Sequence, residues 1–316
     1  MSDSTPEILK VLASQLNVSI ADNSFKIPSG FGKGYCTGYV FNEHMRIIIS
    51  NFELYQDLIF RNPDISNQRK RLFFKFEHIF PISKVTPYNG GPMPIPSVLI
   101  GTSRLNTDEL IAIHTNTATI NIEIDSGYLK GLLNLSGNVT AMKSLLDNKQ
   151  PLLFEQIVYP SIQLIVNEII SEPVHDNFTL FFLKIKAEEL VCRLLMELEK
   201  RSEKQLYALN KVDIATIYKV KEKILDRLDV PPSINELSMI AGMSPSKLKR
   251  LFKQIFGDSI FSYYQHFRIR EAARLLREEE FSVANVGYQL GFTNLSHFSK
   301  VFNEHMGLTP KRYSRV

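Results

Sequence analysis

The sequence of 316 residues has very little cysteine and no long apolar run. Its two cysteines, Cys36 and Cys192, lie too far apart for the short spacing of a metal or redox motif. No stretch approaches the roughly 18–20 apolar residues that cross a membrane. The first ten residues, MSDSTPEILK, also lack the basic and apolar segments of a signal peptide. We therefore expect a cytoplasmic protein with reduced thiols and no membrane partner.

The sequence also lacks the spacing of common catalytic and metal sites. The histidines of the first 209 residues are scattered, with no His-x-His pair: His44, His78, His114 and His175. Cupin enzymes need closely spaced His and carboxylate ligands, and the glycine-rich run at residues 30–34 lacks the spacing of a phosphate-binding loop. We expect no metal, no cofactor and no enzymatic activity. An enzyme fused to a binding domain stays an alternative if the fold gathers these side chains.

Charge is distributed unevenly along the chain. Residues 1–209 carry 20 Lys and Arg against 22 Asp and Glu, whereas residues 210–316 carry 17 against 11. A basic surplus confined to the last third suggests a polyanionic partner for that part of the chain.

The first part of the chain has the pattern of short strands. Ile120, Ile122 and Ile124 alternate with polar residues, as in a strand with one buried face. Similar runs rich in Ile, Val, Phe and Tyr are separated by Gly, Pro and Asn. This pattern predicts a β-rich sandwich or barrel over residues 19–126, followed by helices over 127–204. We expect them to form one domain, residues 1–209, of an α+β protein.

The longest helical pattern, from about residue 178 to 204, has an apolar stripe at heptad-like spacing. Its members are Leu180, Leu183, Ala187, Leu190 and Leu194. The stripe fits a helix packed on its own domain, and it fits a helix that pairs with a second copy of the chain. The sequence leaves both interpretations open.

The last third, residues 210–316, reads as an all-helical domain that contains a repeat. Two short helices are each followed by a glycine turn, at Gly242 and Gly291, and then by a second helix that ends at Gly257 or Gly307. Helix, tight turn and second helix form the helix-turn-helix motif. We expect one motif at about 233–256 and another at about 282–306, joined by a long helix at about 259–279.

The second helix of each motif separates into an apolar and a polar face. In the first motif the apolar residues fall at i, i+3, i+4 and i+7: Leu248, Leu251, Phe252 and Ile255. Ser246, Lys249 and Arg250 lie on the opposite side. A helix that reads DNA needs one face anchored in a small core and another that presents donors and cations.

Residues of about 233–315 resemble the DNA-binding domain of AraC/XylS-type transcriptional regulators. The resemblance rests on SINELSMIAGMSPSKLKRLFKQIFG, on the connecting YYQHFRIREAARLLREEEFSVANVGYQLGF, and on SHFSKVF with the closing GLTPKRY. It implies two recognition helices in successive major-groove segments of promoter or operator DNA. The DNA contacts that it implies are Ser246, Lys247, Lys249, Arg250, Leu295, Ser296, His297, Ser299 and Lys300.

The resemblance also implies partners for the rest of the chain. Residues 1–209 are loosely similar to the family's sensor half, which implies a sensor or dimerisation domain with a cupin-like barrel over residues 19–126. The resemblance also predicts a transcription activator that forms a homodimer, contacts RNA polymerase, works at the nucleoid and binds a small-molecule effector in the barrel. The residues alone leave a second interpretation open, in which the N-terminal half only dimerises or docks another protein.

Overall fold

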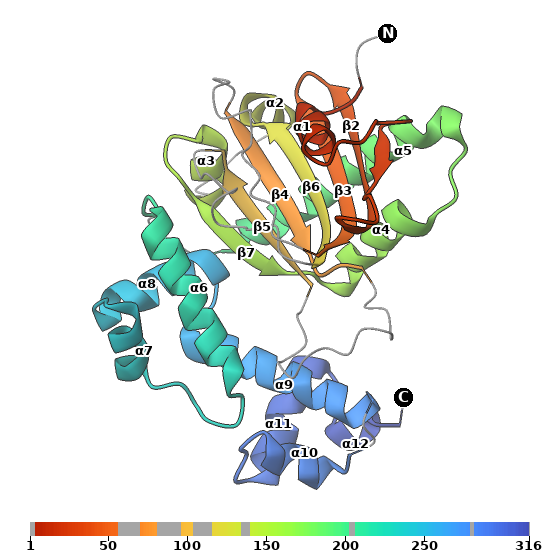
Figure 1. The fold of residues 1–316 in the computed structure, drawn as a ribbon. Coiled ribbons are helices and arrows are strands. Elements are labelled where there is room, and N and C mark those ends of the chain that lie inside the picture. Colours follow the sequence, from red (N-terminus) through yellow and green to blue (C-terminus); the bar gives the residue numbers. More distant parts are fainter. Residues whose placement is uncertain are drawn as a thin grey trace. The chain divides into compact units, whose positions relative to one another are not determined.

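The computed structural model describes residues 4–55, 70–80, 96–103, 116–133, 140–201, 206–278 and 281–315. These residues divide into two compact units, whose boundary in the sequence lies between Lys211 and Val212. The first unit, here called the sheet unit, combines strands and helices, and the second, here called the helical unit, contains helices alone among its described residues (Figure 1). The protein is therefore of mixed α and β class.

The sheet unit is built on one antiparallel sheet of seven strands in the order β1-β2-β3-β6-β4-β5-β7. The strands are β1 (Ser24–Lys26), β2 (Gly32–Asn42), β3 (Met45–Leu54), β4 (Arg71–Glu77), β5 (Ser97–Thr102), β6 (Asn116–Asp125) and β7 (Leu153–Ile157). In the register of β3 with β6, Ile47 faces Ile122 and Ile49 faces Ile120. The alternation expected around Ile122 is thus confirmed as strand β6.

The expected cupin-like barrel is not confirmed, because the sheet is not closed. Among the described strands, β1 and β7 lie at opposite edges and each pairs with one neighbour. Strand β7 also lies within residues 127–204, where only helices were expected. Short strands with turn signals fit a barrel and a helix-covered sheet equally well, since the sequence pattern does not specify which edge strands pair.

Helices cover both faces of the sheet near β2 and β3 (Figure 1). Ile47 and Ile49 pack in one core with α3 (Thr140–Asp147), α4 (Pro160–Ser171) and α5 (Asp176–Glu199). Ile48 and Phe52 point to the other face and pack against α1 (Glu7–Gln15). Period-two alternation of the side chains therefore explains why β3 is buried along almost its whole length. The short helix α2 (Ser126–Leu132) follows β6 directly, with Asp125 as its N-cap.

The apolar stripe that the sequence singled out on α5 is packed inside its own unit. Leu183, Ala187, Leu190 and Leu194 belong to the core beneath the sheet, while Leu180 is 41% exposed. The interpretation as a helix packed on its own domain therefore holds for four of the five residues.

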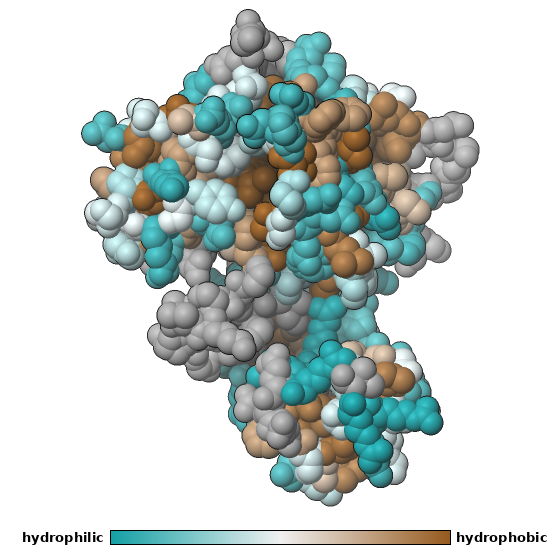
Figure 2. Space-filling view, turned by 90° about the vertical axis from the view of Figure 1, so that its right-hand side faces the viewer, coloured by the Kyte–Doolittle hydropathy of each residue, from teal (hydrophilic) through white to brown (hydrophobic). Residues whose placement is uncertain are grey.

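A second apolar stripe on α5 faces solvent. Its exposed members are Phe178, Phe181, Ile185 and Met196, and Cys192 is exposed between them. Their spacing of three, four, seven and four residues keeps them on one side of the helix. Figure 2 shows hydrophobic residues gathered on the side of the sheet unit that carries α4 and α5.

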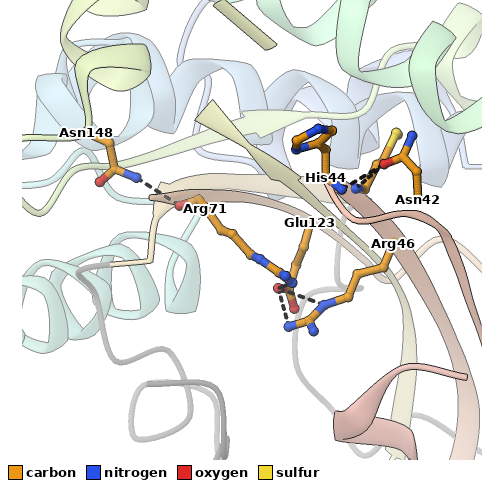
Figure 3. Close-up of polar contacts among 7 residues, drawn as sticks. Asn42, His44, Arg46, Arg71, Glu123 and Asn148 are labelled. Atoms are coloured by element: carbon orange, nitrogen blue, oxygen red, sulfur yellow. Dashed lines mark hydrogen bonds and ion pairs between the residues drawn. The ribbon is translucent and has the colours of Figure 1, made fainter. Parts of the chain in front are cut away.

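The face of the sheet that points away from α3, α4 and α5 carries a buried ion-pair cluster (Figure 3). Arg46 of β3 donates from Nη2 to Oε2 of Glu123 in β6 over 2.6 Å, and its Nε donates to the same oxygen over 3.1 Å. Arg71 of β4 adds a cation 3.7 Å from that oxygen. Arg46 and Glu123 lie opposite each other in the register of β3 with β6, and Arg71 comes from β4 on the other side of β6. The cluster therefore joins three adjacent strands.

The helical unit contains seven helices within its described residues. They are α6 (Lys211–Asp226), α7 (Ile234–Ala241), α8 (Pro245–Phe256), α9 (Ile260–Glu278), α10 (Val283–Gln289), α11 (Leu295–Met306) and α12 (Pro310–Tyr313). Helices α7 and α8 lie where the first helix-turn-helix motif was expected, α10 and α11 lie where the second was expected, and α9 lies between them. None of the described helices in either unit is both long and apolar enough to cross a membrane.

Candidate nucleic-acid interface

The first helix-turn-helix motif is formed by α7 and α8. The Ser233 hydroxyl caps α7 by accepting from the backbone N–H of Glu236, and Gly242 ends that helix in the left-handed region at φ 58°. Ser244 then caps α8, with Pro245 in its first turn. Each residue that defines the turn has the conformation its chemistry favours, so the angle between the two helices is set locally.

Helix α8 has the two faces that the sequence predicted. Leu248, Leu251, Phe252 and Ile255 are buried. Ser246, Lys249, Arg250 and Lys253 are exposed. One side of α8 is therefore anchored in the core while the other offers a hydroxyl and three cations to a ligand.

Lys247, another predicted contact of α8, forms an ion pair within the helical unit. Its Nζ lies 2.8 Å from Oδ1 of Asp213 in α6, and its side chain is 40% exposed. The Asp213 carboxylate is 14% exposed and neutralises part of this charge. The pairing joins residues that lie 34 positions apart, which the sequence pattern could not reveal.

The second motif, formed by α10 and α11, has its own set of caps. The Ser282 hydroxyl accepts from the N–H of Asn285 at the start of α10. Asn294 caps α11, because its Oδ1 accepts from the backbone N–H groups of Ser296 and His297 over 2.9 and 3.1 Å. This cap was not predicted from the sequence, although an Asn directly before an apolar periodic run is the usual signal for one.

The predicted contacts of α11 fall into two groups. Ser296, His297 and Lys300 are exposed, whereas Leu295 and Ser299 are half-buried. A Cβ built on Gly287 of α10 would lie 2.7 Å from Cδ2 of Leu295. The Leu295 side chain therefore packs closely against α10, and it offers an outside surface only in part.

Helix α9 holds both motifs in a single domain. At its N-terminal end Tyr263 packs its ring against Phe252 and Phe256 of α8, with centroids 5.3 and 5.0 Å apart. Its C-terminal half shares a core with Phe298 and Phe302 of α11. The spacing between α8 and α11 is therefore fixed by one continuous helix.

Arg268 of α9 fastens the turn of the second motif. Its Nε donates to the carbonyl of Leu290 over 2.6 Å, and its guanidinium lies 3.6 Å from the ring centroid of Phe292. The side chain is buried, and burial lowers the pKa of this guanidinium, although Tyr264 and Asp229 act against the shift. The role of Arg268 was not predicted from the sequence, because a cation in a basic helix has the pattern of a solvated face.

The described histidines and cysteines are not gathered into one metal-binding cluster. Within the described ranges, no three His, Cys, Asp or Glu residues lie close enough together to hold a metal ion. His44 stacks on Tyr128 with ring centroids 4.8 Å apart, and Cys36 is buried at the sheet.

Comparison with known proteins finds a family match within the helical unit. A family model described as a helix-turn-helix domain matches residues 237–315. The HTH-type transcriptional regulator GlxA of Rhizobium meliloti is 33% identical over 91 residues, which are 29% of this chain and 28% of that protein. The regulatory protein PchR of Pseudomonas aeruginosa is 38% identical over 71 residues, 22% of this chain and 24% of that protein.

The matches to these relatives cover 29% and 22% of this chain. The chain spans about a quarter of the length of the curated relatives that it matches, and these relatives are named as regulators rather than enzymes. Among solved structures, an AraC-type transcriptional regulator from Chromobacterium violaceum is 26% identical, with a TM-score of 0.32 over 34% of this chain and 95% of that one.

The matched segment begins inside α7 and ends after α12, so it includes both motifs and the helix that joins them. The C-terminal domain of this protein is therefore a double helix-turn-helix domain of the AraC/XylS type.

Proposed function

We propose that the protein is a sequence-specific DNA-binding regulator of transcription. One observation carries the proposal: α8 and α11 are each buried on one side against the same helix, α9, and each carries polar or cationic residues on its other side. Two such helices at a fixed spacing suit two successive major-groove segments on one side of a duplex.

The proposed contacts differ in kind. Lys249, Arg250 and Lys300 are exposed cations suited to phosphates or guanine edges, while Ser246, Ser296, His297 and Ser299 suit base edges or phosphates. Lys247 reaches a phosphate only if it releases or shares Asp213. Leu295, held against Gly287, suits an apolar contact such as a thymine methyl group.

The experiment selects binding sites for the full chain from a pool of random duplexes. Fluorescence anisotropy then compares the selected duplex with a scrambled one across several salt concentrations. We expect a preference of at least about 1,000-fold for the selected duplex, the lower range for specific DNA-binding proteins. Equal affinity for both duplexes would contradict sequence-specific recognition. If the selected duplex is preferred, in vitro transcription with RNA polymerase distinguishes activation from repression.

We also propose that the sheet unit forms a homodimer through the exposed stripe of α5. In a two-fold antiparallel pairing of two α5 helices centred near residue 187, Phe178 of one copy lies near Met196 of the other, because these two residues are at opposite ends of the stripe. Beside Ile185, Lys184 and Glu188 form an ion pair with each other within one helix over 3.6 Å. A dimer would double the number of recognition helices on one DNA and raise affinity by effective concentration.

DNA binding alone does not require a sheet unit of this size. We propose that the sheet unit binds a small molecule that controls DNA binding. The alternative is that it only dimerises or docks another protein. A ligand changes DNA binding only if it has different affinity for two states of the protein.

A further inference from the structure

The sheet unit contains a cavity of about 210 Å³ between β2 and the junction of α4 with α5. Its floor is formed by Ile49, Ile169 and Leu183, which are all buried. A cavity of roughly 150 Å³ is enough to hold a benzene molecule. The volume therefore suits a ligand with one ring or a short aliphatic group.

Three aromatic side chains form the walls of the cavity. Tyr35 and Tyr39 come from β2 and Phe182 comes from α5, and all three are half-buried where they line the cavity. Burial raises the pKa of both Tyr35 and Tyr39, so both phenols stay neutral at physiological pH. Aromatic faces attract cations through the ring quadrupole, more strongly once the cation leaves water.

The mouth of the cavity is acidic. Glu172 lines it and is exposed, while Asp22 and Asp176 lie close enough to raise the pKa of Tyr39 by their charges. Among the described residues that line the cavity, none is a lysine or an arginine. Lys186 lies 5.8 Å from the centroid of the Phe182 ring, and it forms ion pairs with Glu168 and Glu189.

We propose that this cavity binds a small organic cation, an ammonium group attached to one compact apolar ring or chain. The apolar part would rest on the aliphatic floor, and the ammonium would lie among the aromatic walls with Glu172 at the mouth. Binding needs nothing from the helical unit. Its consequence, a change in DNA binding, rests on the proposed function.

The probe is 2-phenylethylammonium, compared with neutral 2-phenylethanol and anionic 3-phenylpropanoate. Calorimetry and thermal denaturation of the full chain measure binding, because a ligand that binds the folded state alone raises the melting temperature. We expect the ammonium to bind most tightly, the alcohol about tenfold more weakly as the cation–π attraction is lost, and the carboxylate not to bind. Equal binding of ammonium and alcohol, or no binding by either, would overturn the proposal.

Matched variants locate the site. Tyr39→Leu should weaken ammonium binding about fivefold to tenfold, whereas Tyr39→Phe keeps the ring and should bind like the wild type. Glu172→Gln should weaken it about threefold, as expected for an exposed charge pair, and Glu199→Gln, an exposed glutamate at the end of α5, should change nothing. Val174→Trp at the rim should block the cavity.

The same variants can show that the cavity is not the binding site. If Val174→Trp and Tyr39→Leu, each with an unchanged melting temperature in the free state, bind the ammonium as the wild type does, the cation binds elsewhere and the assignment is wrong.

A separate titration of the selected duplex, with and without the ammonium, tests the consequence. Bound ammonium with unchanged duplex affinity would leave the cavity assignment intact and contradict only control of DNA binding by this ligand. Loss of all sequence preference in the free protein would contradict the proposed function instead.

Discussion

The Arg268 guanidinium lies 3.6 Å from the ring centroid of Phe292 while its Nε donates to the carbonyl of Leu290 over 2.6 Å. One side chain of α9 thus holds both sides of the turn between α10 and α11. The turn sets the direction in which α11 leaves the core, so this contact links the long helix to the proposed second reading helix.

Replacing Arg268 by methionine should destabilise the helical unit by roughly 1–3 kcal/mol. The methionine fills similar space, but the buried carbonyl of Leu290 loses its charged donor. Denaturant unfolding followed by circular dichroism measures the change in free energy of unfolding. Arg312→Met on the surface of α12 is the matched control and should have little effect. Equal stability of both variants would contradict the role of Arg268.

The glycines at the two turns should respond differently to the same substitution. Both have left-handed backbones, with φ 58° at Gly242 and 74° at Gly291. A Cβ on Gly242 meets nothing within 4 Å, whereas a Cβ on Gly291 would lie 1.9 Å from the backbone oxygen of Asp229. We expect Gly242→Ala to cost about 1–2 kcal/mol from the backbone alone.

Gly291→Ala adds a clash with fixed backbone and should cost at least about 3 kcal/mol, in the upper range for single substitutions. Comparison of the two melting temperatures checks the difference. If Gly242→Ala proved the more damaging variant, the close approach of Asp229 to the second turn would be wrong.

Arg250→Ala and Lys300→Ala should weaken DNA binding at different half-sites, because they lie on α8 and α11. A lost base contact should cost roughly 1–3 kcal/mol and relax the preference at one position. A lost phosphate contact should weaken all sequences alike and lower the salt slope by about one. Footprinting on the selected duplex measures which half-site changes. Changes confined to one common half-site would contradict two separate reading helices.

Much of the helical unit could be predicted because its signals are local. Ser233, Ser244, Gly242 and Gly291 each specify a cap or turn through residues a few positions away, and the buried faces follow the helical period. The contacts that depend on distant residues could not be predicted. Asp213 lies 34 positions from Lys247, and nothing in a local window indicates that pair.

The sheet unit was harder to predict for the same reason. Strand β6 was evident from its alternation, but its pairing with β3 and β4 joins distant segments. The pattern of short strands therefore predicted a barrel, while the described strands form an open sheet covered by helices. On α5 the spacing identified the buried stripe, and a second apolar stripe on the exposed side became visible only once the packing was known.

Cys36 should not react with thiol reagents in the folded protein. Its side chain is 1% exposed, and burial raises the pKa of its thiol to about 12, although a contact with Ser50 acts against the shift. The thiolate is the reactive form, so at pH 8 almost none is present. Labelling followed by mass spectrometry should modify Cys36 only after unfolding. Rapid labelling of Cys36 under native conditions would contradict its burial.

Phe181→Glu should convert the proposed dimer into a monomer. Phe181 is 65% exposed on the outer stripe of α5, and in the pairing proposed above a charge there would be buried against apolar residues of the second copy. The matched control is Phe261→Glu, because Phe261 is 57% exposed and lies in the helical unit. Analytical ultracentrifugation should show a dimer for the wild type and for Phe261→Glu, and a monomer for Phe181→Glu.

The labelling rate of Cys192 tests the same surface independently, because Cys192 lies on the outer stripe of α5 and is exposed in the single chain. If α5 pairs with a second copy, labelling of Cys192 should slow as the protein concentration rises through the dimer dissociation constant, and Phe181→Glu should remove that dependence. Ultracentrifugation defines the range of protein concentration over which the dimer forms. If the labelling rate of Cys192 stays constant over that range, the chain pairs through another face and the assignment of α5 as the dimer surface is wrong.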